Sequence, residues 1–165
     1  MKADFNKAVE ESKRILITFG VDSPPVPLTN IVSSYGINIV YADFSSLPKG
    51  NEIAGFMDFD KKKIVVNKDD PPNRQRFTIA HELGHYLLHK DYVKDESRYN
   101  VLLRRPLKDL DYTKEEQEAN CFAANLLVPK EMLEKYKKIP NSISASLFAV
   151  SEDVIKFRKL YNHLS

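Results

Sequence analysis

The sequence predicts an α+β fold, in which a small antiparallel or mixed sheet packs against a pair of helices, with further helices at both ends. Two short apolar runs, 53–59 and 63–66, are bounded by turn residues and predict a strand hairpin. Apolar residues then recur at helical spacing over 74–89, with Asn73 as a possible N-cap, and again over 114–128. We expect the hairpin to lie next to or over the first of these two helices.

The composition indicates an ordinary soluble globular protein. Of the 165 residues, 42% are hydrophobic and 29% are charged, so the chain is long enough to bury a core. We expect one domain over 1–165, with its core at about 28–129 and a helix pair at about 142–164. The formal net charge of +2 gives no reason to expect attraction to nucleic acid or to a membrane surface.

The cysteine count and the N-terminus indicate a cytoplasmic protein. Cys121 is the single cysteine, so neither an internal disulfide nor a zinc site built from thiolates is available. Residues 1–14 are too charged for a secretory signal, and no apolar run approaches the ~18 residues that a membrane span needs. We therefore expect no membrane association.

Three elements are predicted before the hairpin. Apolar residues recur at helical spacing over 3–19, and Gly20 ends the pattern. A proline-rich connector follows, and 28–35 predicts a short helix that Gly36 stops. Residues 37–41 alternate between apolar and polar and predict a strand.

The residues with the clearest chemistry are His81, Glu82 and His85, in the run FTIAHELGHYLLH at 77–89. On a helix the two histidines lie ~40° apart on one face and ~6 Å apart along the axis, so both imidazoles can reach one metal ion. Glu82 falls beside that face, where its carboxylate could take a proton from a metal-activated water. The same five-residue pattern arises by chance in roughly one chain in a few hundred of this length. The motif therefore predicts a zinc site only if the surrounding sequence supplies a third ligand and a suitable helix.

The other faces of this helix predict how it packs. Ala80, Leu83 and Leu87 form an apolar stripe that would bury the helix against a core. Gly84 flanks the metal face, and its missing side chain would let a strand or a peptide substrate come close. His89 aligns with Glu82 rather than between the two presumed ligands, so we expect a capping or surface role for it.

The second helix offers two glutamates as a third ligand. Glu118 points ~160° away from Glu116 on the helical wheel, so the two carboxylates cannot both serve. Ala119 and Ala123 make the flank of the Glu116 face narrow enough for another helix to approach. We choose Glu116 and keep Glu118 as the alternative. Asn120 lies one turn beyond Glu116, where it could hydrogen-bond a ligating histidine and fix its tautomer.

The remaining stretches predict a long loop and a pair of helices. Residues 90–113 are polar and show no clean period, which is typical of a long loop that is mobile or lines a cleft. Residues 143–150 and 153–164 predict two helices, with Ser151 as the N-cap between them. Because the second of these helices is not strongly basic, a structural pair is favoured over a helix-turn-helix that binds DNA.

Two motifs together resemble those of the bacterial and phage metallopeptidases of the ImmA/IrrE type, namely RQRFTIAHELGHYLLH followed by EEQEANCFAANLLVP. The resemblance covers about 53–129 and is far more specific than the histidine motif alone. It implies a zincin-like fold in which one helix bears His81 and His85, a second helix bears Glu116, and Glu82 is the catalytic base. It also implies Zn²⁺ as the cofactor.

The same resemblance implies a function. Members of the family are similar to site-specific endopeptidases that cut a partner repressor, so we expect zinc-dependent cleavage of a protein such as a helix-turn-helix repressor. The alternatives are a metal-binding regulatory module that controls a repressor without cutting it, and a toxin-antitoxin component with incidental protease activity. The sequence leaves open the oligomeric state and the group that steadies the oxyanion, for which Tyr99 and Tyr112 are candidates.

Overall fold

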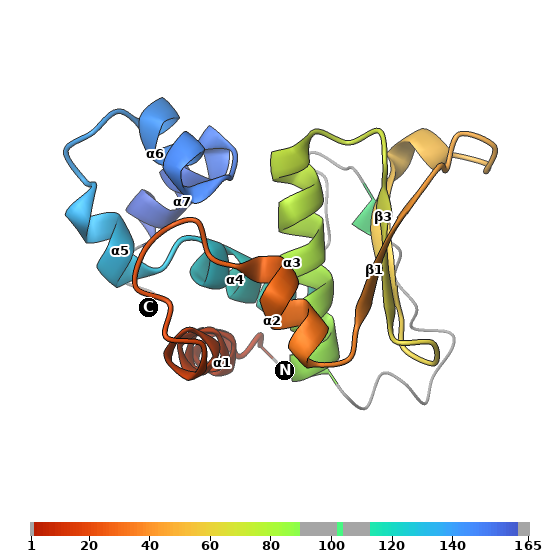
Figure 1. Cartoon of the computed structure of the whole chain (residues 1–165), viewed down its shortest axis with the longest axis horizontal. Helices are drawn as coiled ribbons and strands as arrows, with labels where there is room; N and C mark the ends of the chain where they lie inside the picture. Colours follow the sequence, from red (N-terminus) through yellow and green to blue (C-terminus); the bar gives the residue numbers. More distant parts are fainter. Residues whose placement is uncertain (1, 90–101, 104–112, 162–165) are drawn as a thin grey trace.

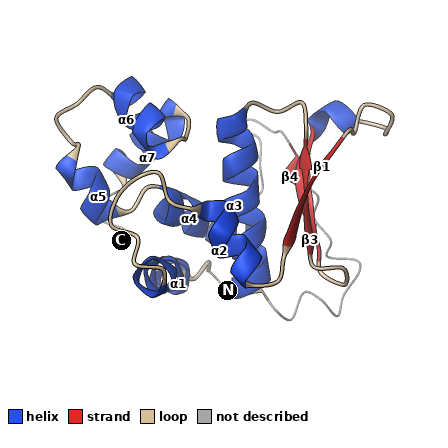
Figure 2. Ribbon diagram, viewed as in Figure 1, coloured by secondary structure: helices blue, strands red, loops and turns tan. Residues whose placement is uncertain are grey.

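The computed structural model describes residues 2–89, 102–103 and 113–161. Within these ranges the sheet lies on one side of helix α3, while α4 and the C-terminal helices lie on the other side (Figures 1 and 2). None of the helices in this part of the chain is long and apolar enough to cross a membrane. The elements follow in chain order: α1 (Phe5–Thr18), α2 (Leu28–Ser34), β1 (Asn38–Ala42), the short 3-10 helix η1 (Gly50–Glu52), β2 (Ile53–Asp58), β3 (Lys63–Asn67), α3 (Pro72–Leu88), β4 (Leu102–Leu103), α4 (Lys114–Leu127), α5 (Lys130–Lys135), α6 (Asn141–Phe148) and α7 (Glu152–Leu160).

The sheet is mixed and has the strand order β1-β3-β2-β4. β2 and β3 form the predicted antiparallel hairpin, in which Phe56 pairs with Val65, while β1 runs parallel to β3. β4 pairs with β2, although its two residues fall in the stretch that we predicted to be loop. Two residues are too few to show an alternating pattern, so only the pairing with β2 defines this strand. The rest of the predicted loop, including Tyr99 and Tyr112, lies outside the described residues.

The helix boundaries are close to those predicted, with two differences. α3 begins at Pro72 rather than after an N-cap at Asn73, because proline has no N–H to satisfy and its φ is preset for the first turn. α5 was not predicted, since its six residues span less than two turns and show little periodicity. The predicted N-cap of α7 is confirmed, because the Ser151 side chain accepts a hydrogen bond from the Val154 N–H.

The core forms where α3 packs against both the sheet and α4. Ile64 and Val66 of β3 are fully buried, as are Ala80 and Leu83 of the predicted apolar stripe. On the opposite face of the core, α4 contributes buried apolar side chains that include Phe122. α3 is therefore covered on both sides, which holds its histidines in a stiff frame.

Gly84 provides the close approach that the sequence suggested, but to a different neighbour. A Cβ atom at Gly84 would lie 2.9 Å from Phe122 Cδ1 and 3.3 Å from Ala119 Cα. The space beside the glycine is therefore filled by α4, and not by a strand or a peptide substrate as we had expected. This contact sets the distance between the two helices that carry the predicted site.

The C-terminal helices are joined to this core by a buried arginine. Arg158 of α7 is only 1% exposed, and its Nε donates a 3.0 Å hydrogen bond to the carbonyl of Val128, just after α4. α6 and α7 pack against each other, with Phe148 and Ile155 fully buried. The pair therefore rests on the end of α4 rather than standing apart from the domain.

Candidate metal centre

The donor atoms of three predicted ligands converge where α3 packs against α4. His81 Nε2 lies 3.3 Å from Glu116 Oε2, and His85 Nε2 lies 3.0 Å from Glu116 Oε1. The two Nε2 atoms are 3.0 Å apart, and one donor atom from each of the three residues lies within 4.8 Å of the others. The structure thus brings Glu116 to the histidines, while Glu118 of the same helix is not in this group.

Local structure explains why these side chains meet. His81 and His85 are one turn apart on α3, so their rings lie side by side with centroids 4.7 Å apart. Glu116 sits in the first turn of α4, where its N–H donates a 3.3 Å hydrogen bond to the hydroxyl of the N-cap Thr113. The contact at Gly84 then brings this first turn of α4 within reach of the imidazoles.

The electrostatics of the cluster favour a cation. Burial would raise the pKa of Glu116, but its contacts with the His81 and His85 rings outweigh this effect and hold that pKa well below its usual range. Burial lowers the pKa of His85 to about 4, so its imidazole is neutral near pH 7. Burial opposes a charge on His81, yet the Glu116 carboxylate raises its pKa. An ionised carboxylate and a neutral imidazole are metal donors, and a dication could displace the proton that His81 shares with Glu116.

Asn120 lies where the sequence suggested. Its Oδ1 is 2.9 Å from His81 Nδ1. A carbonyl oxygen can only accept, so with this amide orientation Nδ1 carries a hydrogen, and Nε2 is the atom whose lone pair faces the cluster once the proton shared with Glu116 is displaced. The fit to a metal is therefore consistent in both donor type and tautomer.

Glu82 lies on the side of α3 that faces the sheet. It is 2% exposed, and its Oε1 has no hydrogen-bond partner among the described residues. Burial raises its pKa to about 7, with the nearby charge of His81 opposing this shift, the charge of Glu116 adding to it and a hydrogen bond to the Met57 backbone opposing it. A buried carboxylate oxygen without a partner beside the donor cluster suits a group that exchanges protons near neutral pH.

His89 differs most from its prediction. Its N–H caps α3 by donating to the carbonyl of His85, as a capping residue should. Its side chain is only 8% exposed, however, so the surface role was wrong. His89 Nδ1 lies 3.1 Å from His85 Nδ1, and His89 Nε2 lies 2.9 Å from Glu118 Oε2. The repeat of histidine at positions 81, 85 and 89 was the signal in the sequence that could have predicted this contact.

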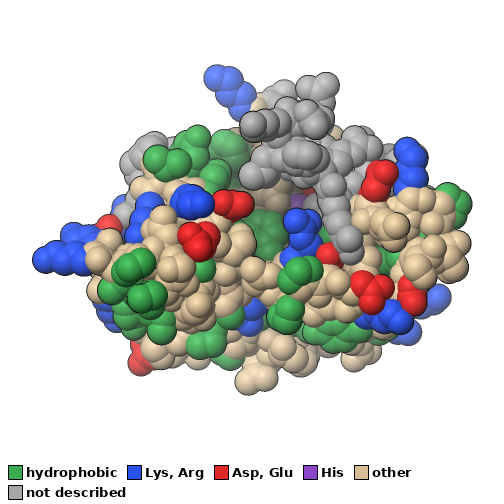
Figure 3. Space-filling view, turned by 90° about the horizontal axis from the view of Figure 1, so that it is seen from above, with side chains coloured by type: hydrophobic (Ala, Val, Ile, Leu, Met, Phe, Trp, Pro, Cys, Tyr) green, Lys and Arg blue, Asp and Glu red, His purple; other side chains and the backbone are tan. Residues whose placement is uncertain are grey.

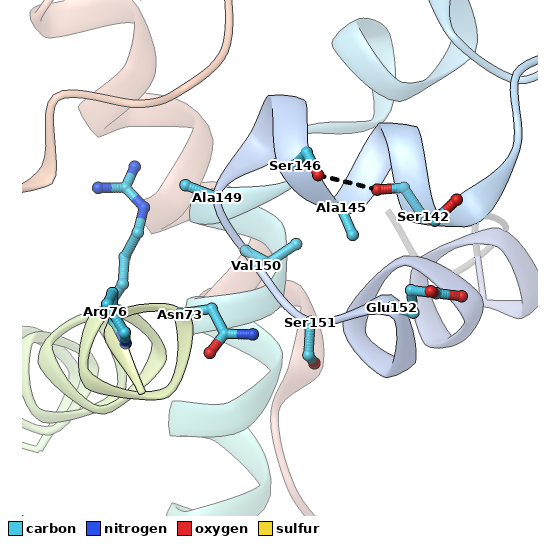
Figure 4. Close-up of a pocket in the computed structure, with 10 residues that line it drawn as sticks. Asn73, Arg76, Ser142, Ala145, Ser146, Ala149, Val150, Ser151 and Glu152 are labelled. Atoms are coloured by element: carbon cyan, nitrogen blue, oxygen red, sulfur yellow. Dashed lines mark hydrogen bonds between the residues drawn. The ribbon is translucent and has the colours of Figure 1, made fainter. Parts of the chain in front are cut away.

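The surface of the molecule shows a histidine side chain (Figure 3), and a pocket lies away from the cluster. In the space-filling view a histidine side chain is visible among acidic, basic and hydrophobic side chains (Figure 3). A separate pocket lies between the start of α3, with Asn73 and Arg76, and the helix pair α6 and α7, with Ser146 and Glu152 (Figure 4). None of the described residues that line this pocket belongs to the predicted site.

Comparisons with known proteins give a consistent family. The family model of the IrrE N-terminal-like domain matches residues 32–159. An uncharacterized immunity region protein 2 of Bacillus phage phi105 is 37% identical over 93 residues, which cover 53% of this chain and 52% of that protein. The metallopeptidase ImmA of Bacillus subtilis is 30% identical over 114 residues, 63% of this chain and 62% of that protein. The radiation response metalloprotease IrrE of Deinococcus radiodurans is 30% identical over 125 residues, 67% of this chain and 37% of that protein.

A solved structure described as a Mycobacterium tuberculosis transcriptional regulator shares the fold. It superposes with a TM-score of 0.62 at 17% sequence identity, over 91% of this chain and 45% of that one. The chain spans less than two thirds of the length of each of these relatives. Because the family model covers most of the chain, and two of the relatives are metallopeptidases by name, this chain belongs to the ImmA/IrrE family of metallopeptidases.

Proposed function

We propose that the protein is a zinc-dependent endopeptidase in which His81, His85 and Glu116 hold the metal and Glu82 is the catalytic base. The observation that carries the proposal is the convergence of two imidazole Nε2 atoms and one carboxylate within 4.8 Å. Two histidines and one glutamate are a common protein donor set for a catalytic zinc ion, which leaves a further position for water or substrate. Family membership supports the same reaction class.

Each residue of the site would have its own role in the reaction. Zinc, when bound, supplies Lewis-acid activation of a water molecule and of the scissile carbonyl. Glu82 Oε1 would accept a proton from the attacking water and later donate it to the leaving amine as the C–N bond breaks. A pKa of about 7 lets this carboxyl group both accept and release a proton near neutral pH. Asn120 would keep His81 in the tautomer that presents Nε2.

We further propose that the substrate is a partner protein, such as a helix-turn-helix repressor, met in the cytoplasm. One relative is named as an immunity region protein of a phage and another as a radiation response metalloprotease. Both names support a regulatory setting in which a specific protein is the target. The net charge of +2 gives no support for direct binding to nucleic acid.

Cleavage of a purified repressor tests this proposal. The zinc-loaded protein is incubated with purified helix-turn-helix repressors from its own host, and the fragments are identified by mass spectrometry. Glu82→Gln should retain the same zinc content but cut at least about 100-fold more slowly, because the proton acceptor is lost. Glu131→Gln, an exposed acid on α5, should cut at the wild-type rate.

Two outcomes would exclude the proposed reaction. If Glu82→Gln keeps its zinc and cuts as fast as the wild type, Glu82 is not the base. If the wild type leaves the repressor intact but removes it from its operator DNA, the protein is a regulatory binding module and not a protease.

A further inference from the structure

We infer that His89 and Glu118 are positioning residues that hold His85 in the tautomer required of a metal ligand. The inference rests on the proposed metal site and extends it to two residues that lie outside the set of metal donors. Their geometry forms a continuous chain of contacts from the backbone of Asp4 to the ring of His85.

The contacts follow one another without a break. The Asp4 N–H donates a 2.7 Å hydrogen bond to Glu118 Oε1. Glu118 Oε2 lies 2.9 Å from His89 Nε2, and His89 Nδ1 lies 3.1 Å from His85 Nδ1. At the end of the chain, His85 Nε2 is the atom that lies 3.0 Å from Glu116 Oε1. We call these three side chains, Glu118, His89 and His85, the relay.

The chemistry of each group fixes where the hydrogens lie. Glu118 accepts at both oxygens, so His89 must donate from Nε2. A neutral His89 then has a lone pair at Nδ1, which can only accept, so His85 must donate from its own Nδ1. When a metal is bound, the lone pair of His85 is thereby placed on Nε2, the atom that lies next to Glu116 Oε1 in the metal-free protein. Reversing any one of these bonds would put a hydrogen on the atom that must bind the metal.

The same device serves the other histidine ligand by a shorter route. His81 Nδ1 meets the amide oxygen of Asn120 directly at 2.9 Å. Each of the two imidazoles thus has a partner at Nδ1 and presents Nε2 to the cluster. Such hydrogen bonds to the far nitrogen of a metal-binding histidine orient the ring and increase its basicity.

Burial argues that the relay is more than a surface contact. Glu118 is 7% exposed and His89 is 8% exposed. Removing a carboxylate from water is costly, and replacing a buried hydrogen-bonded pair that contains a charge by apolar residues is often neutral or stabilising. Stability alone therefore gives little reason to place this pair at the α3–α4 contact, whereas metal binding does.

The relay can be removed without leaving a buried charge. In the double variant His89→Leu/Glu118→Leu, two apolar side chains replace the pair, so the fold should be retained. The single variants His89→Leu and Glu118→Leu each remove one member. We expect the double variant, and each single variant, to bind Zn²⁺ about 10–100-fold more weakly than the wild type. The affinity is measured by competition with a chromophoric chelator.

Two further measurements separate positioning from a general structural role. The affinity losses should not add, so that the double variant loses no more than the weaker-binding single variant, because all three changes interrupt one relay. The visible absorption of the Co²⁺-loaded protein should also change, since the His85 ligand is no longer oriented. Lys7→Met is the matched control. It removes the 2.9 Å hydrogen bond from Lys7 Nζ to the Leu88 carbonyl, next to the relay, and should leave both readouts unchanged.

The results distinguish this inference from the proposed function. If the variants bind Zn²⁺ within about twofold of the wild type, or if the single losses add, the relay is overturned even if the wild type cleaves its substrate. If the variants lose affinity as expected but the wild type cleaves nothing, the relay stands and the endopeptidase proposal fails. A wild type that binds no Zn²⁺ overturns both.

Discussion

The glutamates that lie on the two sides of helix α3 have pKa values shifted in opposite directions. On the side that faces α4, Glu116 meets His81 and His85, and its contacts with these rings keep its pKa well below the usual range. On the side that faces the sheet, Glu82 lies beside the backbone of Met57, and burial raises its pKa to about 7. Both residues are largely buried, so burial alone does not decide their charge.

The pKa values of the two carboxyl groups differ because each group faces a different neighbouring element. α4 is held close to α3, and its first turn brings an acid against two imidazoles. The sheet presents apolar side chains and a backbone to the other side of α3, where a negative charge is poorly compensated. The Glu116 carboxylate of α4 is therefore suited to hold a cation, and the Glu82 carboxyl group of α3 is suited to exchange a proton.

The largest expected effect comes from removing the carboxylate that α4 contributes to the site. Glu116→Gln removes the ionised donor, so Zn²⁺ affinity should fall by more than about 100-fold, beyond the loss caused by changing a residue that only supports a ligand. Chelator competition measures the change. Glu115→Gln, which alters the neighbouring acid on the same turn of α4, is the control and should stay within a few-fold of the wild type. Equal affinities for Glu116→Gln and the wild type would show that the metal is held elsewhere.

The sheet side is tested by the stability of the metal-free protein. The folded pKa of Glu82, about 7, is above its ordinary value of 4.5. The contribution of Glu82 to the free energy of unfolding is therefore fully present below pH 4.5 and is lost as the pH rises through 7. Glu82→Gln cannot ionise, so it should be more stable than the wild type at pH 8, by up to about 3 kcal/mol, and nearly equal to it at pH 4.5.

Urea denaturation at both pH values measures this difference. The exposed Glu131→Gln is the control and should follow the wild type at each pH. A gap between Glu82→Gln and the wild type that is the same at pH 4.5 and at pH 8 would mean that Glu82 does not titrate as its burial requires.

The smallest expected effect concerns the close contact between α3 and α4 at Gly84. In Gly84→Ala the new Cβ would lie 2.9 Å from Phe122 Cδ1 and 3.3 Å from Ala119 Cα, so α4 must move away from α3. The gain in helix propensity is about 1 kcal/mol, and the overpacking cost is about 1–3 kcal/mol. We expect a net loss of about 1 kcal/mol in the free energy of unfolding, together with weaker Zn²⁺ binding. A more stable variant with unchanged Zn²⁺ affinity would contradict a role for this contact in placing Glu116.

The sequence by itself determined the features that depend on residues within one or two turns. The spacing of His81 and His85, the apolar stripe behind them and the N-cap at Ser151 are local patterns. The structure has the spacing and the N-cap, and it buries Ala80 and Leu83 of the stripe while Leu87 is partly buried. The hairpin of β2 and β3 was also predictable, because turn residues separate two short apolar runs. The family resemblance added the order of the motifs, which the family model supports over residues 32–159.

Tertiary structure alone decided the contacts between distant segments. His81 and Asn120 are 39 residues apart in sequence, and His89 and Glu118 are 29 apart. A helical wheel could orient Glu118 away from Glu116, but it could not show that His89 would be buried opposite Glu118. The pairing of β4 with β2 was hidden for the same reason. Side-chain periodicity reports which face of an element is apolar, whereas the partner of a buried polar group is set by how two elements pack.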